Sequence, residues 1–260
     1  MNKKTVILLA GSIFLSSCAT GSHLDKKYRE AVADAAQALK TELSNELFAV
    51  NEENRKVVRS EDGSKVLVLT WKSQDSFDKY LKPYDKTSEN EQHVVWVTLA
   101  PQVYELCHGY IEENPGATKE ALDLRLKQYL GLKHTWYYDV FVEMGVSPND
   151  LFRPCVNPEI HDSRCGLHFQ DDMPQVKGIE NYGRFYRDLY YKSFRSSDGV
   201  PWTGLGHTHD WGNPLSEVGA SEYILSPGSG YEIKGVTGTM EYCKQSSLRK
   251  DVFDPTTISP

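Results

Sequence analysis

The stretch KVVRSEDGSKVLVLTW, residues 56–71, decides the fold. It places an Asp62-Gly63 pair between two runs rich in β-branched residues, and such a pair supplies the positive φ angles that a tight hairpin turn requires. We therefore predict a β-hairpin over residues 56–71. Because a hairpin pairs its strands antiparallel, we expect the sheet of this protein to be largely antiparallel.

Strands and helices are interspersed along the rest of the chain. Short apolar runs predict strands at 93–99, 137–144, 222–225, 231–236 and 239–243, the last being TMEYC. Apolar residues at helical spacing predict helices at 101–113, 118–132 and 180–194. Thr118 caps the second of these helices and Gly131 ends it. Because the order has no regular βαβ rhythm, the sequence favours an α+β fold, a single mixed domain with several helices.

A further helix is predicted near the N-terminus. From residue 24 to residue 48, apolar side chains recur every three or four positions, which is the period of one helical face. We therefore expect one long amphipathic helix over this range.

The first residues have the pattern of an export signal. Lys3 and Lys4 precede an apolar run over residues 6–15. This run is too short to cross a membrane, which takes about 20 apolar residues, and its basic start fits a secretory leader.

The tetrapeptide LSSC, residues 15–18, ends the apolar run and resembles the lipobox of bacterial lipoproteins. The resemblance implies that residues 1–17 are a signal peptide, that Cys18 is acylated, and that residues 18–23 are a lipidated tether. Ala19 and Thr20 follow, without an aspartate, which resembles lipoproteins sorted to the outer membrane. The implied location is the bacterial cell envelope, with the domain held close to the bilayer because the tether is short.

Composition narrows the class of partner. The chain carries a formal net charge of −7 and has no basic block, so nucleic acid is not an expected partner. An apolar content of 39% with many aromatic residues predicts a globular protein, with one α+β domain over residues 24–243 and a polar tail over residues 244–260.

Four cysteines follow Cys18, and an exported protein is expected to use them in two disulfides. Three pairings are possible. The short, proline-rich interval between Cys155 and Cys165 favours that pair, which leaves Cys107 with Cys243. A zinc site with His161 and His168 is the alternative for Cys155 and Cys165, but its spacing is poor, with no CxxC or HxxxH pair.

The segment GLGHTHDWGN, residues 204–213, has two interpretations. On a strand, His207 and His209 point to the same face, so they can bind a metal with Asp210 or a distant carboxylate, as in a metal-dependent hydrolase. Glycines punctuate the segment, however, and Asp210 would lie on the opposite face. The favoured interpretation is a turn in which Asp210 caps backbone amides and both histidines are partly solvated.

The segment ASEYILSPGSGYEIKGV, residues 220–236, resembles the strand and turn around the catalytic glutamate of ADP-ribosyltransferases. By this resemblance Glu222 matches the catalytic glutamate, Ser196 or Ser197 the serine of the family, and Arg153 the arginine that holds the dinucleotide phosphates. Ala220 stands where arginine-modifying members have a glutamate. A plain β-hairpin with an exposed Glu222 explains the same residues.

Five aromatic residues offer a third kind of site: Trp136, Tyr137, Tyr138, Trp202 and Trp211. They can form a face for stacking a sugar ring, or they can fill the core. Neither a GxSxG elbow nor an HExxH helix occurs in the sequence. We therefore expect a lipid-anchored envelope protein with a binding or structural role, without a cofactor, that contacts an envelope protein or glycan. The alternative is an enzyme using one of the two candidate sites above.

Overall fold

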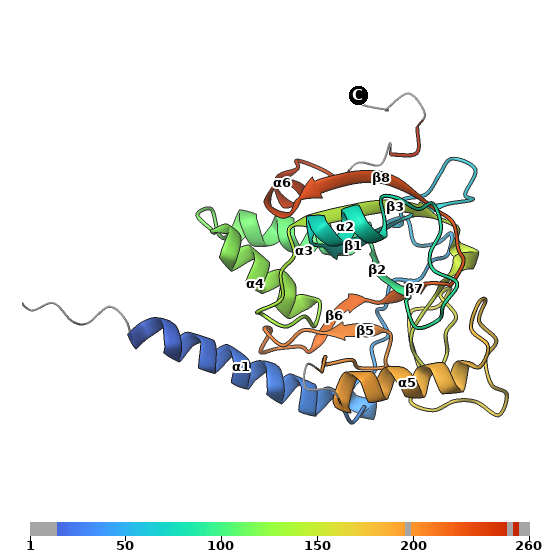
Figure 1. Cartoon of the computed structure of the whole chain (residues 1–260), viewed down its shortest axis with the longest axis horizontal. Helices are drawn as coiled ribbons and strands as arrows, with labels where there is room; N and C mark the ends of the chain where they lie inside the picture. Colours follow the sequence, from blue (N-terminus) through green and yellow to red (C-terminus); the bar gives the residue numbers. More distant parts are fainter. Residues whose placement is uncertain (1–14, 196–198, 249–251, 255–260) are drawn as a thin grey trace, which may run out of the picture.

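The computed structural model describes residues 15–195, 199–248 and 252–254, with side chains from residue 23 onward. Its centre is a six-stranded sheet of order β4-β7-β2-β1-β3-β8, in which every neighbouring pair is antiparallel (Figure 1). The strands are β1 (Val66–Lys72), β2 (Val95–Leu99), β3 (Val140–Val146), β4 (Leu151–Phe152), β7 (Tyr223–Leu225) and β8 (Tyr231–Gly238). A separate ribbon pairs β5 (His207–His209) with β6 (Val218–Ser221).

Helices surround this sheet. They are α1 (Leu15–Ala35), α2 (Gln74–Tyr80), α3 (Ala100–Glu113), α4 (Lys119–Tyr129), α5 (Tyr182–Arg195) and α6 (Thr239–Lys244), with short 3-10 turns at Lys40–Glu42 and Pro148–Asp150. The Thr118 hydroxyl caps α4 by accepting from the Ala121 amide, and Gly131 after α4 has a positive φ. The predicted α+β fold with a largely antiparallel sheet is confirmed.

Both faces of the sheet are buried, as β1 shows. Val66 and Val68 pack in a cluster with β3 and α2, while Leu67, Leu69 and Trp71 pack in a second cluster with α3, α4 and α6. A strand covered on both faces is expected to be a continuous apolar run, which is how VLVLTW reads in the sequence.

The helices of the second face are divided into two groups. α3, α4 and α6 cover the β1–β3 part, whereas α5 packs on Phe152 of β4 and Ile224 of β7. The register of the strands shows that both groups of helices lie on one face. Ile224, under α5, pairs with Trp96 of β2, and Leu69, under α3 and α4, pairs with Thr98 of β2. Trp96 and Thr98 are two residues apart in one strand, so their side chains point to the same face. The middle of this face is therefore not covered by a helix.

The structure contains both predicted disulfides. Cys107 of α3 is bonded to Cys243 of α6, and Cys155 is bonded to Cys165 in the loop after β4. The second bond removes both thiolates that a zinc site would need. His161 is also engaged, since its Nδ1 lies 2.9 Å from the Val50 carbonyl oxygen.

Two predicted elements are wrong. TMEYC forms helix α6 instead of a strand, and its buried residues Thr239, Tyr242 and Cys243 have helical spacing. The N-terminal helix ends at Ala35 rather than at residue 48. The chain beyond it is held by distant partners, because the Leu47 amide donates to the Ser163 carbonyl and the Phe48 amide to the Ser221 hydroxyl.

The hairpin at residues 56–71 is present only in part. Gly63 has a φ of 69°, and the Leu67 amide donates to the Val58 carbonyl, so the turn forms as predicted. Its first arm is reduced to a single bridge between Arg59 and Val66. The first arm cannot extend further along β1 because other strands occupy both of its edges. β3 pairs with β1 along its whole length, and β2 pairs with the other edge.

Part of the predicted polar tail also contacts the domain. Val252 and Phe253 pack against the cluster of α3, α4 and α6. A Cβ on Gly145 of β3 would lie 2.7 Å from the Phe253 ring, so glycine at this position makes room for the ring.

Candidate functional site

A cavity of about 380 Å³ lies where the helical layer is divided. The sheet strands β1 and β2 line one side of it. The other lining residues include residues 130–132 after α4, residues 200–202, Leu189 and Ser193 of α5 and Thr208 of β5. Most of this lining is apolar, and four of its residues are Trp71, Trp96, Tyr138 and Trp202. Such a cavity, with few polar groups, is typical of a small-molecule site.

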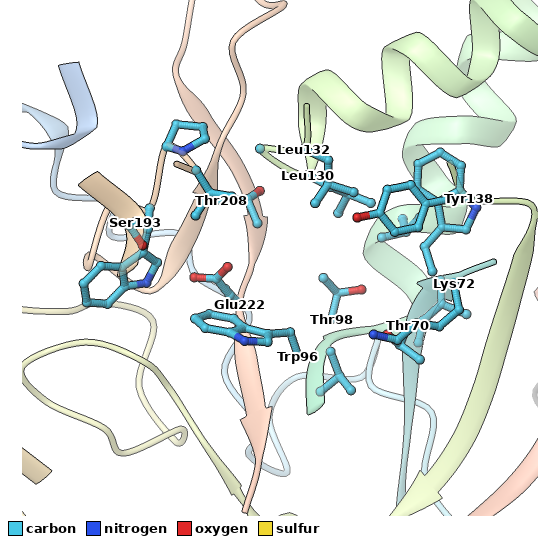
Figure 2. A pocket seen from close by; sticks show the side chains of 18 of the residues that line it. Thr70, Lys72, Trp96, Thr98, Leu130, Leu132, Tyr138, Ser193, Thr208 and Glu222 are labelled. Carbon is cyan, nitrogen blue, oxygen red and sulfur yellow. The ribbon is translucent and has the colours of Figure 1, made fainter. Parts of the chain in front are cut away.

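Glu222 is the acidic group of this cavity. It lies between β6 and β7 and follows the register that pairs Trp96 with Ile224, so its side chain is on the same face of the sheet as Trp96 and Thr98. Figure 2 shows the carboxyl group of Glu222 beside Trp96, Thr98 and Thr208. Among the described residues, its Oε2 atom has no hydrogen-bond partner.

Burial raises the pKa of Glu222 to about 8. The carboxyl group is therefore mostly protonated at pH 7. In this form it can donate a hydrogen bond into the cavity. A neutral carboxylic acid in an apolar site acts either as a hydrogen-bond donor to a bound molecule or as a general acid.

Lys72 of β1 is the second charged group near the cavity, on the side opposite Glu222 (Figure 2). Burial lowers the pKa of its ammonium. Lys192 of α5 also lines the cavity and donates to Gln92. The indole nitrogen of Trp202 has no hydrogen-bond partner within the described part of the chain. The cavity therefore offers hydrogen-bond donors to a ligand.

The structure does not bring Arg153 to Glu222. Arg153 is fully buried, donates to Asp162 and to the Arg164 carbonyl, and lies over the Tyr223 ring. Tyr223 follows Glu222 directly, and neighbouring residues of a strand point to opposite faces, so the two side chains are separated by the sheet. Ser196 and Ser197 lie outside the described residues.

Arg153 also explains a glycine in the GLGHTHDWGN segment. Gly206 has a φ of 80°, and a Cβ there would lie 2.5 Å from the Arg153 Cδ. This glycine therefore serves the close approach of the buried arginine rather than a ligand.

The predicted set His207, His209 and Asp210 is not gathered around one point. Asp210 forms a two-pronged ion pair with Arg125 of α4, with N···O distances of 2.9 and 2.7 Å, and accepts from the Gly212 amide. The predicted capping role of Asp210 is thus present. The predicted exposure of the histidines is wrong, because His207 is 2% and His209 is 5% exposed.

His209 instead lies beside two carboxylates that are distant in the sequence. Its Nε2 is 3.1 Å from Asp34 Oδ2 on α1 and 3.9 Å from Glu217 Oε2, just before β6. One donor atom from each of the three residues lies within 4.8 Å of the others. Sequence patterns could not find this set, because Asp34 and His209 are 175 positions apart.

The five aromatic residues do not form one surface. Tyr138 and Trp202 line the cavity, Trp211 packs edge-on against Tyr28 of α1, and Tyr137 is exposed. Two of the five therefore contribute to the candidate ligand site.

Comparisons with protein-family models, curated proteins and solved structures find no match to this chain. Within the described residues, none of the helices combines the length and apolar character needed to cross a membrane. The functional argument therefore rests on the chemistry of the site.

Proposed function

We propose that this is a lipid-anchored protein of the bacterial cell envelope that binds a small, mostly apolar molecule in the cavity at Glu222. The observation that supports binding most is the buried carboxyl group in an aromatic cavity, with one oxygen that no described residue satisfies. Buried polar atoms are usually paired, so an unpaired one facing a cavity favours a bound partner. The export leader and the lipobox around Cys18 support the location.

The ligand is expected to carry a hydrogen-bond acceptor on an apolar body. The raised pKa of Glu222 makes it a donor at neutral pH, so a carbonyl or ether oxygen of the ligand can accept a hydrogen bond from it. Rings such as those of Trp96 and Trp202 favour a flat apolar partner. The volume of about 380 Å³ is near the lower end of ligand sites, which favours a small molecule.

The two enzymatic alternatives have less support. A hydrolase at His207, His209 and Asp210 lacks its third ligand because Asp210 is paired with Arg125. An ADP-ribosyltransferase would need Arg153 exposed to a dinucleotide, and this arginine is fully buried.

Binding of a water-soluble aromatic ketone tests the proposal. We expect 4-fluoroacetophenone to bind the full-length protein in nanodiscs at pH 6.5, measured by ¹⁹F NMR against empty nanodiscs. Affinity should fall about tenfold by pH 9.5, because ionised Glu222 no longer donates to the ketone. Glu222→Gln keeps a neutral donor, so its binding should not change with pH, which separates Glu222 from Lys72 and Lys192. Glu222→Leu should bind weakly at both values.

Glu232→Gln is the matched control, since Glu232 lies on β8 and bonds to Lys65 and Lys234 rather than to the cavity. It should behave as the wild type does. No binding at pH 6.5, or the same pH dependence in wild type and Glu222→Gln, would show that the cavity is not a ligand site of this kind.

The anchor is tested by Cys18→Ser. We expect the wild-type protein to incorporate radiolabelled palmitate and to sediment with membranes, and the variant to lose the label and to be unprocessed or released, because only the lipid provides the anchor. Ser17→Ala, which keeps a small residue before the cysteine, is the control. Unchanged membrane association and processing of Cys18→Ser would contradict acylation.

A further inference from the structure

Two carboxylates and one imidazole meet between the end of α1 and the β5–β6 ribbon. Asp34 is in the last turn of α1, His209 ends β5, and Glu217 lies just before β6. Figure 1 shows α1 running along the side of the domain that carries this ribbon. The imidazole of His209 is buried, whereas the two carboxylates are about half exposed, with side-chain exposures of 47% and 51%.

A hollow of about 440 Å³ opens at this cluster. Its lining includes Asp34, Glu42, Glu217, His207 and His209, but no lysine or arginine. One carboxylate oxygen of Asp34 and one of Glu217 lie within 4.8 Å of each other and of a His209 ring nitrogen. A cation between the two carboxylates would offset the repulsion of their like charges.

Only one nitrogen of the His209 imidazole has a hydrogen-bond partner among the described residues, since Nε2 lies 3.1 Å from Asp34 Oδ2. Nδ1 of His209 is buried and has no hydrogen-bond partner among the described residues. Nε2 faces both carboxylates. In the tautomer with its proton on Nδ1, His209 presents the Nε2 lone pair toward the two carboxylates, where one cation can contact all three groups.

We propose that Asp34, His209 and Glu217 bind a divalent metal of the zinc class that joins α1 to the β5–β6 ribbon. One imidazole nitrogen and two carboxylate oxygens are a donor set that zinc accepts in proteins. Three protein ligands beside an open hollow leave a coordination position for water. This site is separate from the Glu222 cavity, so the inference goes beyond the proposed function.

The position of the site gives it a structural consequence. On the N-terminal side of Asp34, two side chains hold α1 against the domain. Tyr28 packs on Trp211 and donates to the Gly199 carbonyl. Asp25 lies near His134. The metal adds a link between the C-terminal end of the helix and the β5–β6 ribbon. The described helix starts at Leu15, three residues before Cys18. The metal therefore stabilises the helix that connects the proposed lipid anchor to the sheet domain.

Zinc titration of the full-length protein tests the site. After treatment with a chelator, we expect calorimetry to show one zinc ion per chain and the melting temperature to rise by several degrees. Asp34→Asn and Glu217→Gln keep the size of the exposed side chains and should each weaken zinc binding at least tenfold. In wild-type protein, zinc should slow amide exchange within residues 23–35, and this protection should be absent from both variants.

Asp25→Asn is the matched control. Asp25 is also an acidic residue of α1, but it lies 3.5 Å from His134 and does not line the hollow. This variant should bind zinc as the wild type does. Absence of stoichiometric zinc, or binding by Asp34→Asn and Glu217→Gln that equals that of the wild type, would overturn the proposal and indicate that the three side chains form a hydrogen-bonded cluster without a metal.

Discussion

Replacing Cys107 and Cys243 together with alanine lowers the free energy of unfolding by about 5 kcal/mol in the chain-entropy model. The bond joins residues 136 positions apart, so its loss frees most of the unfolded chain. It also joins α3 to α6 over one face of the sheet, where both cysteines are fully buried. Denaturant unfolding, followed by tryptophan fluorescence without reductant, measures this loss as a lower midpoint at nearly constant slope.

The second disulfide is the matched control. Cys155 and Cys165 are also buried, but they close a loop of only 10 positions. The same model gives a loss of about 3 kcal/mol for their double alanine variant. Equal losses for the two pairs, or a larger loss for the short loop, would show that packing around the sulfur atoms outweighs the constraint on the unfolded chain.

Glu222→Gln is expected to stabilise the protein by about 3 kcal/mol at pH 9 and to have little effect near pH 4.5. The pKa of Glu222 is raised from 4.5 to about 8 in the folded state. Between these values the folded state binds the extra proton, so the contribution of Glu222 to wild-type stability falls as pH rises and levels off above about pH 9. The full shift corresponds to nearly 5 kcal/mol, and we expect a smaller effect because structural relaxation and water penetration reduce the penalty of burying a carboxylate.

Urea unfolding at pH 4.5, 6, 7.5 and 9 measures the effect of Glu222→Gln. Glu232→Gln is the control with the opposite sign, because hydrogen bonds from Lys65 and Lys234 lower the pKa of Glu232. Its effect should be a loss of under about 1 kcal/mol at pH 9, since the ion pairs are exposed. A stability difference between Glu222→Gln and wild type that does not change with pH would show that Glu222 is hydrated like a surface residue.

Most elements were predictable because their signals are local. Within each of these segments, the spacing of the apolar residues indicates either a helix or a strand. This holds for β1, β2, α3, α4 and α5. The disulfide pairs were predictable because the short interval between Cys155 and Cys165 left one partner for Cys107. The wrong predictions, in contrast, concern segments whose apolar residues suit two conformations. In TMEYC the bond to α3 and the packing of Tyr242 select the helix.

The candidate sites depended on tertiary structure to different degrees. Glu222 was identified from the sequence, but through a resemblance that gave it Arg153 as a partner, and only the sheet register shows that Arg153 lies on the opposite face. His209 was also identified from the sequence, with Asp210 or an unnamed distant carboxylate as the further ligand. The carboxylate of Asp210 is instead paired with Arg125, which is 85 positions away in the sequence.

By itself, the sequence determined the type of most elements and the export leader pattern, and it favoured one set of disulfide pairs, because each depends on residues that are close in the chain or on their number. Only the tertiary structure decided where α1 ends, that Glu222 is enclosed in an aromatic cavity, and that Asp34 and Glu217 meet His209. The physical reason is that pKa values, ion pairs and metal ligands depend on distance and burial in space. Folding brings together segments that are far apart in the chain, and no local sequence pattern indicates that they will meet.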